Sequence, residues 1–432
     1  MSSSPPATPD PPPARTAARQ MILGTAAIGA LGVFSMHVLL PALPAIRDAL
    51  GSDDATVQLL ISLGMLAIAF GNLVVGPLSD RFGRKPVTYA GLGLFVGGSA
   101  LAAAAPGVEV LIFARIVQAF GGGAAMSVAR AMVTDFFGAG GAAASAMAYS
   151  AMTVLVVPMV APTIGGFTIE WANWRTTFAL TLVVGVTVTA LTMRRLGETQ
   201  VAASAGHPRP GLVRSYRQLL GTPEYLGRAL CCTALMCTVY TFIAGAPYVG
   251  IHVMGLRPST YGLLFVLPAI ASFCGFLVAG RVSRRAGPDR MIRYGVIGSF
   301  TAVASFAILM AAGLWHPLAL FVPGMVLTFS NAIAVPSAMS SAIAVRPDIA
   351  GAASGLTGFM QLAVSAAATQ AVAALADGTP APLAGTMAVA NGCAIVAFLV
   401  MIRLRARAPT GPLQAPANVA EGARRDVDRA DA

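Results

Sequence analysis

Few residues of this chain could carry a reversible charge inside an apolar environment. His37 is the only histidine well within an apolar run, and the ordinary histidine pKa of about 6.5 suits repeated protonation. Arg115 stands in another apolar run, where an arginine is costly and therefore usually functional. We interpret these two residues as proton-coupling candidates, in which the charge of Arg115 tunes the protonation of His37.

Each of these residues has a simpler explanation that stays open. His37 could line a cavity or bond to a neighbouring helix. Arg115 lies about two turns inside its run, from where its guanidinium could extend to the edge. No Asp or Glu lies deep within an apolar run. The acidic residues nearest to the runs all lie at their edges: Asp80, Asp135, Glu109 and Glu170.

The elements that carry these residues are long and apolar. The chain has 432 residues, of which 56% are hydrophobic and 10% are charged, whereas soluble domains contain about 25% charged residues. Because so few charges cannot cover a water-soluble surface, most of the chain must face the lipid bilayer. The net charge of +11 does not indicate nucleic-acid binding, since the arginines form short clusters between apolar runs and no continuous basic face.

Twelve apolar runs reach the length of about 20 residues that a helix needs to cross the hydrocarbon core. They are residues 21–43, 56–78, 87–106, 109–131, 143–168, 176–195, 228–250, 259–280, 290–313, 317–341, 350–375 and 384–403. One long polar gap divides them six and six. We therefore predict a six-helix bundle at 21–195, a cytoplasmic loop at 196–227, a second six-helix bundle at 228–405, and disordered tails at 1–20 and 406–432.

Positive charge predicts the orientation of the spans. Loops after even-numbered spans and the C-terminal tail carry most of the arginines. Because such loops stay in the cytoplasm, we expect both termini there. The preference for arginine over a single lysine and the high Ala and Gly content suggest a GC-rich bacterial genome. We therefore expect a multi-pass protein of the bacterial inner membrane.

The two halves resemble each other in one polar segment. GPLSDRFGRKP at residues 76–86 has a degenerate counterpart, GRVSRRAGPDR, at residues 280–290, and each lies between the second and third spans of its half. Such repeats recur in secondary transporters, whose binding sites lie near mid-membrane between the halves.

The first of these segments resembles the cytoplasmic loop motif of the major facilitator superfamily. That resemblance implies an all-α integral membrane protein with the major facilitator fold, two six-helix bundles related by pseudo-symmetry. Gly83 permits a tight turn, and Asp80 can cap the next turn and pair with Arg84 or with a helix end of the other half. The predicted conformational loop motif comprises Gly76, Asp80, Arg81, Gly83, Arg84 and Lys85.

Two further motifs follow along the chain. Arg115 with Gln118 and Gly121 resembles the superfamily's fourth-helix motif, a buried arginine followed by glutamine and small residues. Pro162, Gly165 and Gly166 resemble the fifth-helix signature of exporters in its drug–proton antiporter branch, where a Pro-Gly kink would let the helix bend during transport.

LPALP at residues 40–44 and AGAPYV at residues 244–249 are similar to the bicyclomycin and chloramphenicol resistance (Bcr/CflA) group of multidrug exporters. The resemblance covers about residues 21–405 and implies export of a hydrophobic compound driven by protons. One position departs from the group, because His37 stands where an acidic residue is common.

Other polar, aromatic or flexible side chains within the spans are candidates to line a substrate cavity. They are Met36, Tyr240, Phe242, Asn331, Gln361 and Gln370. For any one of them, packing between helices is an equally good explanation. The sequence contains no phosphate-binding GxxxxGK[ST], no HExxH, no GxSxG and no Cys/His metal cluster. We therefore expect no enzyme, no metal and no cofactor.

The leading hypothesis is a monomeric exporter of hydrophobic small molecules that works by alternating access and proton antiport. One alternative keeps the fold and transports a metabolite such as a sugar, amino acid or siderophore. Another is a membrane receptor or enzyme subunit without transport. The paired six-helix repeats and the lack of a soluble domain count against that last alternative.

Overall fold

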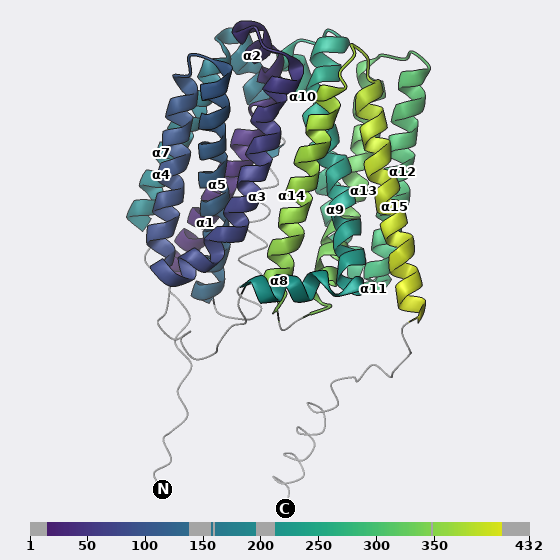
Figure 1. The fold of residues 1–432 in the computed structure, drawn as a ribbon. Coiled ribbons are helices and arrows are strands. Elements are labelled where there is room, and N and C mark those ends of the chain that lie inside the picture. Colours follow the sequence, from purple (N-terminus) through teal and green to yellow (C-terminus); the bar gives the residue numbers. More distant parts are fainter. Residues whose placement is uncertain (1–14, 138–156, 159, 196–211, 347–348, 408–432) are drawn as a thin grey trace, which may run out of the picture.

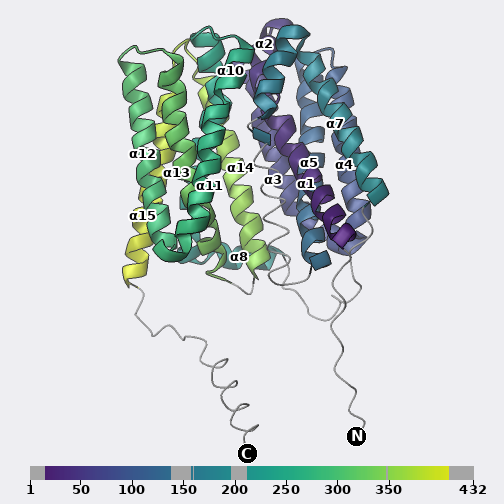
Figure 2. The same ribbon diagram turned by 180° about the vertical axis from the view of Figure 1, so that it is seen from behind.

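The computed structural model describes residues 15–137, 157–158, 160–195, 212–346 and 349–407. All regular secondary structure in these residues is helical, as predicted. The long helices form two bundles that stand side by side, as Figure 1 shows and Figure 2 confirms from behind.

The first bundle contains five labelled long helices and a helix at residues 160–171. The labelled helices are α1 (Arg15–His37), α3 (Asp54–Phe82), α4 (Arg84–Ala103), α5 (Val108–Phe137) and α7 (Trp174–Arg195). The second bundle contains α9 (Pro223–Pro247), α11 (Val266–Ala286), α12 (Pro288–Ala311), α13 (Pro317–Ile343), α14 (Ala350–Ala374) and α15 (Ala381–Arg407). The short helices are η1 (Leu40–Ala42), α2 (Leu43–Leu50), α8 (Leu212–Leu220), η3 (Tyr248–Val253) and α10 (Pro258–Leu264).

Eleven helices in the described part of the chain are long and apolar enough to cross a membrane. Most of the predicted span 143–168 lies outside the described residues. Large apolar side chains point outward from both bundles: Phe113, Ile308 and Val389 are 59%, 67% and 69% exposed. Such a surface is stable only against lipid, because no favourable interaction would offset the free-energy cost of exposing these apolar side chains to water.

Several boundaries differ from the predictions. The helix α1 begins at Arg15 and not at 21, and α5 continues to Phe137 and not to 131. An apolar run ends where the hydrocarbon ends, but backbone hydrogen bonds can extend the helix into the polar layer beyond it. The predicted span 259–280 divides at Phe265 into α10 and α11, close to Pro268, which lacks the N–H that would continue the hydrogen-bond ladder.

The predicted central loop, residues 196–227, contains the short helix α8. Ser215 and Leu219 are buried, whereas Arg214 and Arg217 are exposed. The spacing of four between the buried residues puts them on one helical face. Figure 1 shows α8 lying across the lower end of the second bundle.

Both described ends of the chain, at Arg15 and Arg407, lie at the same end of the molecule (Figure 1). We call this the terminal end and the opposite one the distal end.

The internal repeat is visible as matching backbone geometry in the two halves. Gly83, between α3 and α4, has φ 97° and ψ 151°, and Gly287, between α11 and α12, has φ 78° and ψ 159°. Both positive φ angles favour glycine. The same interval of sequence separates five glycine pairs: Gly51 and Gly255, Gly71 and Gly275, Gly76 and Gly280, Gly83 and Gly287, Gly91 and Gly295.

Candidate functional site

The two halves meet through polar contacts at the distal end. The Glu170 carboxylate accepts hydrogen bonds from the Ser259 hydroxyl at 2.6 Å and from its backbone N–H at 3.1 Å. The Thr163 hydroxyl donates to the carbonyl of Gly262 at 2.9 Å. Because Ser259 and Gly262 belong to α10 of the second half, these contacts join the halves. Together with the next contact we call them the distal clasp.

The third member of the clasp joins α2 to η3. The Arg47 guanidinium lies 3.4 Å from the ring nitrogens of His252, and it also pairs with Asp54 at 3.1 Å. The clasp and the ion pair that supports it therefore contain two carboxylates, one imidazole and one guanidinium. The hydrogen bonds from Ser259 hold the pKa of Glu170 below its ordinary value, because they stabilise the charged form.

The predicted fifth-helix motif lies at this clasp. A Cβ added to Gly166 would collide with the backbone carbonyl of Pro258 in the second half. A Cβ added to Gly165 would collide with the carbonyl of Val38 in the first half. Pro162 is buried, and its carbonyl lies against Gly262. The two adjacent glycines therefore let one helix pack closely against both halves.

Contacts between the halves continue inward along α3 and α14. The Gln370 side chain accepts a hydrogen bond from the Ser62 hydroxyl at 2.8 Å and donates one to the carbonyl of Ala55 at 2.8 Å. Further along, the rings of Phe70 and Phe359 meet edge to face at 5.3 Å. Gln370, predicted to line a cavity, thus bonds across the boundary in this conformation.

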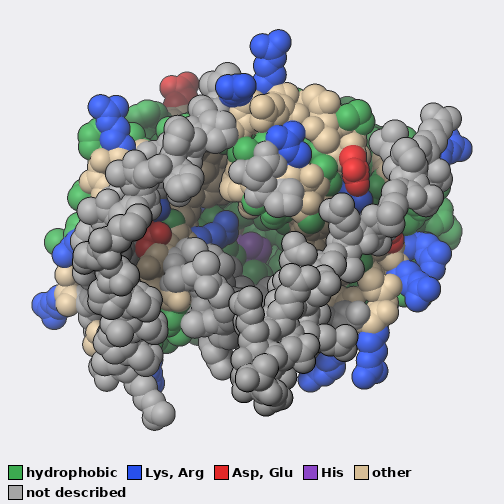
Figure 3. All heavy atoms as spheres, turned by 90° about the horizontal axis from the view of Figure 1, so that it is seen from below, with side chains coloured by type: hydrophobic (Ala, Val, Ile, Leu, Met, Phe, Trp, Pro, Cys, Tyr) green, Lys and Arg blue, Asp and Glu red, His purple; other side chains and the backbone are tan. Residues whose placement is uncertain are grey.

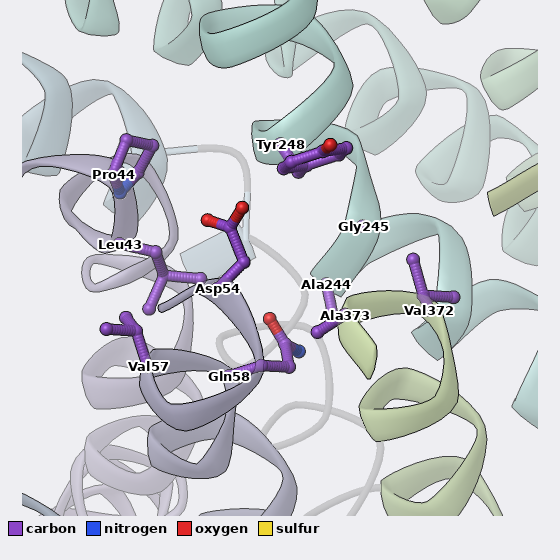
Figure 4. A pocket seen from close by; sticks show the side chains of 10 residues that line it. All are labelled: Leu43, Pro44, Asp54, Val57, Gln58, Ala244, Gly245, Tyr248, Val372 and Ala373. Carbon is purple, nitrogen blue, oxygen red and sulfur yellow. The ribbon is translucent and has the colours of Figure 1, made fainter. Parts of the chain in front are cut away.

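A small pocket lies between the halves on the distal side, shown in Figure 4. Its lining is mostly apolar, with the polar groups of Asp54, Gln58 and Tyr248 among them. Gln58 is 8% exposed, and its amide nitrogen has no protein hydrogen-bond partner. A buried amide nitrogen beside the other polar groups of the pocket is a suitable partner for an ordered water. The pocket is therefore a small space that stays open between the halves at the closed distal end.

The terminal end differs from the distal end. Figure 3, which views the molecule from below, shows a hollow near the centre of this face, with hydrophobic, Lys or Arg, and His side chains at its floor. The hydrogen bonds between the halves described above lie on the distal side. The described residues thus form a structure that is closed distally and hollowed at the terminal end.

Arg115 is buried within the first bundle and does not extend to its edge, at 1% exposure. Its guanidinium donates to Gln118 at 2.6 Å, to the Ser35 hydroxyl at 3.1 Å and to the carbonyl of Leu60 at 3.3 Å. Gln118 in turn donates to the hydroxyls of Ser99 and Thr181, at 2.7 and 3.2 Å. The fourth-helix motif therefore connects α1, α3, α4, α5 and α7 through neutral groups. Gly121 packs against the carbonyl of Gly91 in α4.

His37 lies at the end of α1 and is 5% exposed. Its Nδ1 lies 2.8 Å from the carbonyl of Val33, so this nitrogen carries a proton that it donates. Among the described residues His37 makes no hydrogen bond to Arg115. The two are connected only through the same stretch of α1, because Arg115 bonds to Ser35, two positions before His37. Their proposed coupling would act through space, not through a shared bond.

A second arginine of α5, Arg130, did not figure in the sequence interpretation. The predicted span ended at 131, which placed Arg130 at the membrane surface. Because α5 continues to Phe137, Arg130 lies about two turns inside the helix. Its side chain is exposed. The length of a helix, which hydropathy does not predict, was the missing signal.

The other cavity candidates have mixed positions. Phe242 is 1% exposed, and its ring packs against Gly324 within the second bundle, as the packing alternative predicts. Met36 is also buried, in an apolar cluster of the first bundle that extends to Ala244 and Ala366 of the second. The Gln361 amide donates to the Cys232 sulfur at 3.2 Å. Asn331 is buried, and its amide donates to the carbonyl of Leu327 at 3.0 Å.

The loop motif contains an ion pair that the sequence did not reveal. The guanidinium of Arg84 pairs with Asp135 of α5 at 2.8 Å and also donates to the Ser79 hydroxyl. Arg81 is exposed and lies over the ring of Phe82, while the Lys85 ammonium lies over the ring of Tyr89. The environments of Gly76 and of the Asp80 side chain are outside the described part of the structure, so the predicted contacts of Asp80 stay predictions.

Comparison with known proteins identifies the architecture. A sequence profile described as Major Facilitator Superfamily matches residues 25–369. The chain belongs to the major facilitator superfamily. Its members are transporters, and the predicted fold of two pseudo-symmetric bundles is confirmed by this match together with the matching glycine geometry of the halves.

Curated relatives of this major facilitator protein include several named for drug resistance. Multidrug resistance protein D of Escherichia coli is 29% identical over 332 residues, 77% of this chain and 83% of the relative. The bicyclomycin resistance protein homolog of Haemophilus influenzae is 26% identical over 391 residues, 89% of this chain and 96% of the relative. The chloramphenicol resistance protein of Pseudomonas aeruginosa is 29% identical over 326 residues, 74% and 76% of the two chains. The predicted similarity to this resistance group is confirmed.

Solved structures share the fold. A bacterial homologue of the human lysosomal transporter Spinster, in an inward-facing and occupied conformation, aligns with a TM-score of 0.70 at 13% identity and covers 91% of this chain and 98% of its own. The nucleoside transporter NupG aligns with a TM-score of 0.67 at 12% identity, over 89% and 99% of the two chains.

Proposed function

We propose that this transporter is a secondary exporter of hydrophobic small molecules, including drugs, and that it works by alternating access between its two halves. The observation that carries the proposal is the unequal boundary between two matching halves. The distal clasp closes one end, whereas the other end is hollowed (Figure 3). The names of the relatives, which refer to resistance to chloramphenicol, bicyclomycin and multiple drugs, support the substrate class.

The proposed orientation puts the terminal end in the cytoplasm, because that end carries the arginine-rich loops around residues 81–85 and 281–290. The protein would act as a monomer. Its halves, residues 21–195 and 228–405, would move as two rigid units, with residues 196–227 as the connecting loop. The hollow would then admit substrate from the cytoplasm. Opening of the distal clasp, with closure of the terminal end, would release the substrate outside.

Proton coupling is the finer part of the proposal. His37 would bind and release the proton, since no carboxylate lies deep within an apolar run, and the charge of Arg115, buried in the same bundle, would favour the neutral imidazole. The positive charge of Arg115 would thus oppose protonation of His37, and the strength of this repulsion would change when the halves move.

The loop motif would act as a latch at the terminal end. The Arg84–Asp135 ion pair ties the start of α4 to the end of α5, and the hydrogen bond from Arg84 to Ser79 extends this connection to the last turn of α3, which carries Asp80. A fixed loop can present a charge to the other half when the terminal end closes. Asp80→Asn is therefore expected to lower flux in the assay described next, while the protein stays in the membrane. Full activity of that variant would remove the latch from the mechanism.

The test uses inverted membrane vesicles that contain the full-length chain and are energised to an acidic interior. A panel of a cationic dye (rhodamine 6G), a neutral dye (N-phenyl-1-naphthylamine) and an anionic dye (1-anilinonaphthalene-8-sulfonate) is added outside. The proposal predicts uptake of at least one dye that collapses when a protonophore removes the gradient. Absence of gradient-dependent uptake for every dye, with the protein shown to be present, would contradict the proposal.

A glycine pair connects this assay to alternating access. Gly166→Ala puts a methyl group against the carbonyl of Pro258 across the boundary, so the distal clasp should fail to close and uptake should fall about tenfold or more. Gly351→Ala is the matched control, because no atom outside its own helix lies within 4 Å of the added Cβ. Equal activity of the two variants would contradict a role for clasp closure in transport.

A further inference from the structure

The helix α8 does not run along the axes of the two bundles. Figure 1 shows it lying crosswise to α14 at the terminal end of the second bundle. The chain turns after α8 because Thr222 has extended backbone angles, φ −104° and ψ 102°, and Pro223 begins α9. A residue before proline is disfavoured in the helical conformation, and proline at the first position fixes the start of the next helix. This break therefore keeps α8 out of line with α9.

The short connection holds α8 at the depth where the membrane spans end. Only Gly221 and Thr222 separate α8 from α9, and α9 begins the apolar segment Pro223–Val253, which is long enough to cross a membrane. Two extended residues bridge at most about 10 Å, and the headgroup layer on each side of a bilayer is about 5–7 Å thick. The end of α8 therefore lies at or beside the layer of lipid headgroups.

One face of α8 is fixed against the second bundle. Leu219 is buried in an apolar cluster that includes Tyr225 of α9 and Ala353 of α14. Ser215, four residues before Leu219, is also buried, and the Tyr216 side chain packs against the same cluster. Because residues four apart lie on one face of a helix, these contacts determine the direction of the opposite face.

The opposite face of α8 carries two cations and one apolar side chain. Arg214, Arg217 and Leu220 are all exposed, Leu220 by 52%. With about 100° of rotation per residue, Arg217 lies opposite the midpoint between Ser215 and Leu219, and Arg214 and Leu220 flank it. Such a face suits the boundary between headgroups and acyl chains, where the leucine meets lipid and the arginines extend to phosphate.

The positive charge of this face is not neutralised within the part of the chain that the structure describes. Neither Arg214 nor Arg217 forms an ion pair with a described carboxylate. Residues 199–223 contain three arginines and no Asp or Glu. The next acidic residue, Glu224, pairs with Arg228 at 2.8 Å. The exposed face of α8 therefore complements an anionic surface.

We propose that the exposed face of α8 docks on anionic phospholipids of the cytoplasmic leaflet, with Arg214 and Arg217 at the phosphate groups and Leu220 at the upper part of the acyl chains. A guanidinium suits a phosphate because the two form paired charge-assisted hydrogen bonds. Each arginine should strengthen the interaction roughly fivefold. The choice of leaflet rests on the proposed orientation, whereas the docking itself does not depend on export.

The test places a fluorescent reporter on the docking face. Leu220→Trp changes an exposed position, and the full-length variant is reconstituted into phosphatidylcholine nanodiscs that contain a small fraction of lipid brominated in its acyl chains. Bromine quenches tryptophan on contact, and the wild-type protein gives the signal of the native tryptophans for subtraction. We expect brominated phosphatidylglycerol to quench residue 220 at least about fivefold more effectively than brominated phosphatidylcholine.

Charge variants in the same background identify the groups that bind the lipid. Arg214→Gln combined with Arg217→Gln should bring the quenching ratio close to one, and lysine at both positions should retain part of the preference. The matched control combines Arg281→Gln with Arg285→Gln, which removes two exposed arginines of α11 and should leave the ratio at residue 220 unchanged. Thermal unfolding verifies that each variant is folded.

Several results would overturn the proposal. Absence of quenching by either lipid would place residue 220 in water, and equal quenching by both lipids, or a preference that survives the loss of both arginines, would exclude anionic lipid as the partner. Glycerol 3-phosphate in solution tests a free phosphate: loss of the preference would assign the face to a soluble anion and reject docking, and retention supports it. No transport is measured, so failure here leaves the export proposal standing.

Discussion

The two halves of this transporter share a backbone frame, the packing of their equivalent helices, and differ in the side chains that lie between those helices. Gly71 approaches the carbonyl of Phe120 in the first half, and Gly275 approaches the carbonyl of Phe329 in the second. These equivalent contacts set how closely the second and fourth helices of each half pack, because glycine alone lets two backbones come this near. The backbone geometry is therefore the same in the two halves although their side chains differ.

The interiors of the matched helices are chemically different. Arg115 of α5 corresponds to Gly324 of α13, and where the first half has a guanidinium network, the second half has the ring of Phe242 packed on that glycine. Arg130 corresponds to Met339. The difference teaches that the second half packs without these charges, and we propose that the charges of the first half serve function. The predictions below test that conclusion.

The largest effect is expected for Arg115→Met. Transport should be lost by more than about a hundredfold, because the buried charge disappears. The free energy of unfolding should change by less than about 2 kcal/mol, since removal of the desolvation cost of an unpaired cation offsets the loss of one donor each by Gln118, Ser35 and the carbonyl of Leu60. Vesicle flux and thermal unfolding of the purified variant measure the two quantities. A decrease in the free energy of unfolding far above about 2 kcal/mol would show that Arg115 is needed for stability. The first half would then depend on its charge for packing, contrary to the comparison with the second half.

A strong but smaller effect is expected for His37→Gln. Glutamine keeps a donor for the carbonyl of Val33 but cannot take up a proton, so gradient-driven flux should fall about tenfold or more while downhill exchange of dye persists. His316→Gln is the control, because that histidine caps α13 at an exposed position. Unchanged gradient-driven accumulation in His37→Gln would exclude His37 from proton coupling.

The shared frame itself is tested by one substitution made at two equivalent positions. A Cβ on Gly91 would lie 3.0 Å from the nearest atom, the carbonyl oxygen of Gly121, whereas a Cβ on Gly295 would collide with the Cβ of Ala334. We expect Gly295→Ala to destabilise the protein by about 2–3 kcal/mol and Gly91→Ala by roughly 1 kcal/mol or less. Thermal unfolding decides the order, and an equal or reversed order would refute the tighter packing of the second half.

A modest effect is expected at the loops between the second and third helices. The first half has the Arg84–Asp135 pair, whose side chains are 11% and 27% exposed. A double-mutant cycle with Arg84→Ala and Asp135→Asn should give a coupling energy of about 1 kcal/mol, the scale of partly exposed ion pairs. Additive effects of the two changes would mean that the pair contributes nothing to the first-half loop.

The smallest effect concerns pH at the distal clasp, where a carboxylate of the first half meets Ser259 of the second. Because hydrogen bonds lower the pKa of Glu170 from its ordinary 4.5, its contribution to closure is fully present above pH 4.5 and is lost as pH falls through the lowered value. The rate at which a thiol reagent labels a cysteine introduced into the distal pocket should therefore be constant between about pH 7 and 5 and rise only in stronger acid. Glu170→Gln should abolish that rise; a rise near pH 6 would point to another titrating group.

Hydropathy, charge and glycine spacing alone determined the helical spans, the division into halves and the sharp turn at Gly83. These features depend on local sequence: an apolar run of sufficient length must form a helix in lipid, and a position with positive φ favours glycine. The repeated segments at residues 76–86 and 280–290 therefore predicted the pseudo-symmetry correctly.

Only the tertiary structure decided which polar side chains meet. Sequence distance does not reveal that Gln370 bonds to Ser62 across the halves or that Arg84 pairs with Asp135. The sequence also left open whether Phe242 lines a cavity or packs between helices, and in this structure its ring packs against Gly324. Hydropathy measures the preference of a residue for lipid, whereas the direction of its side chain depends on how neighbouring helices pack.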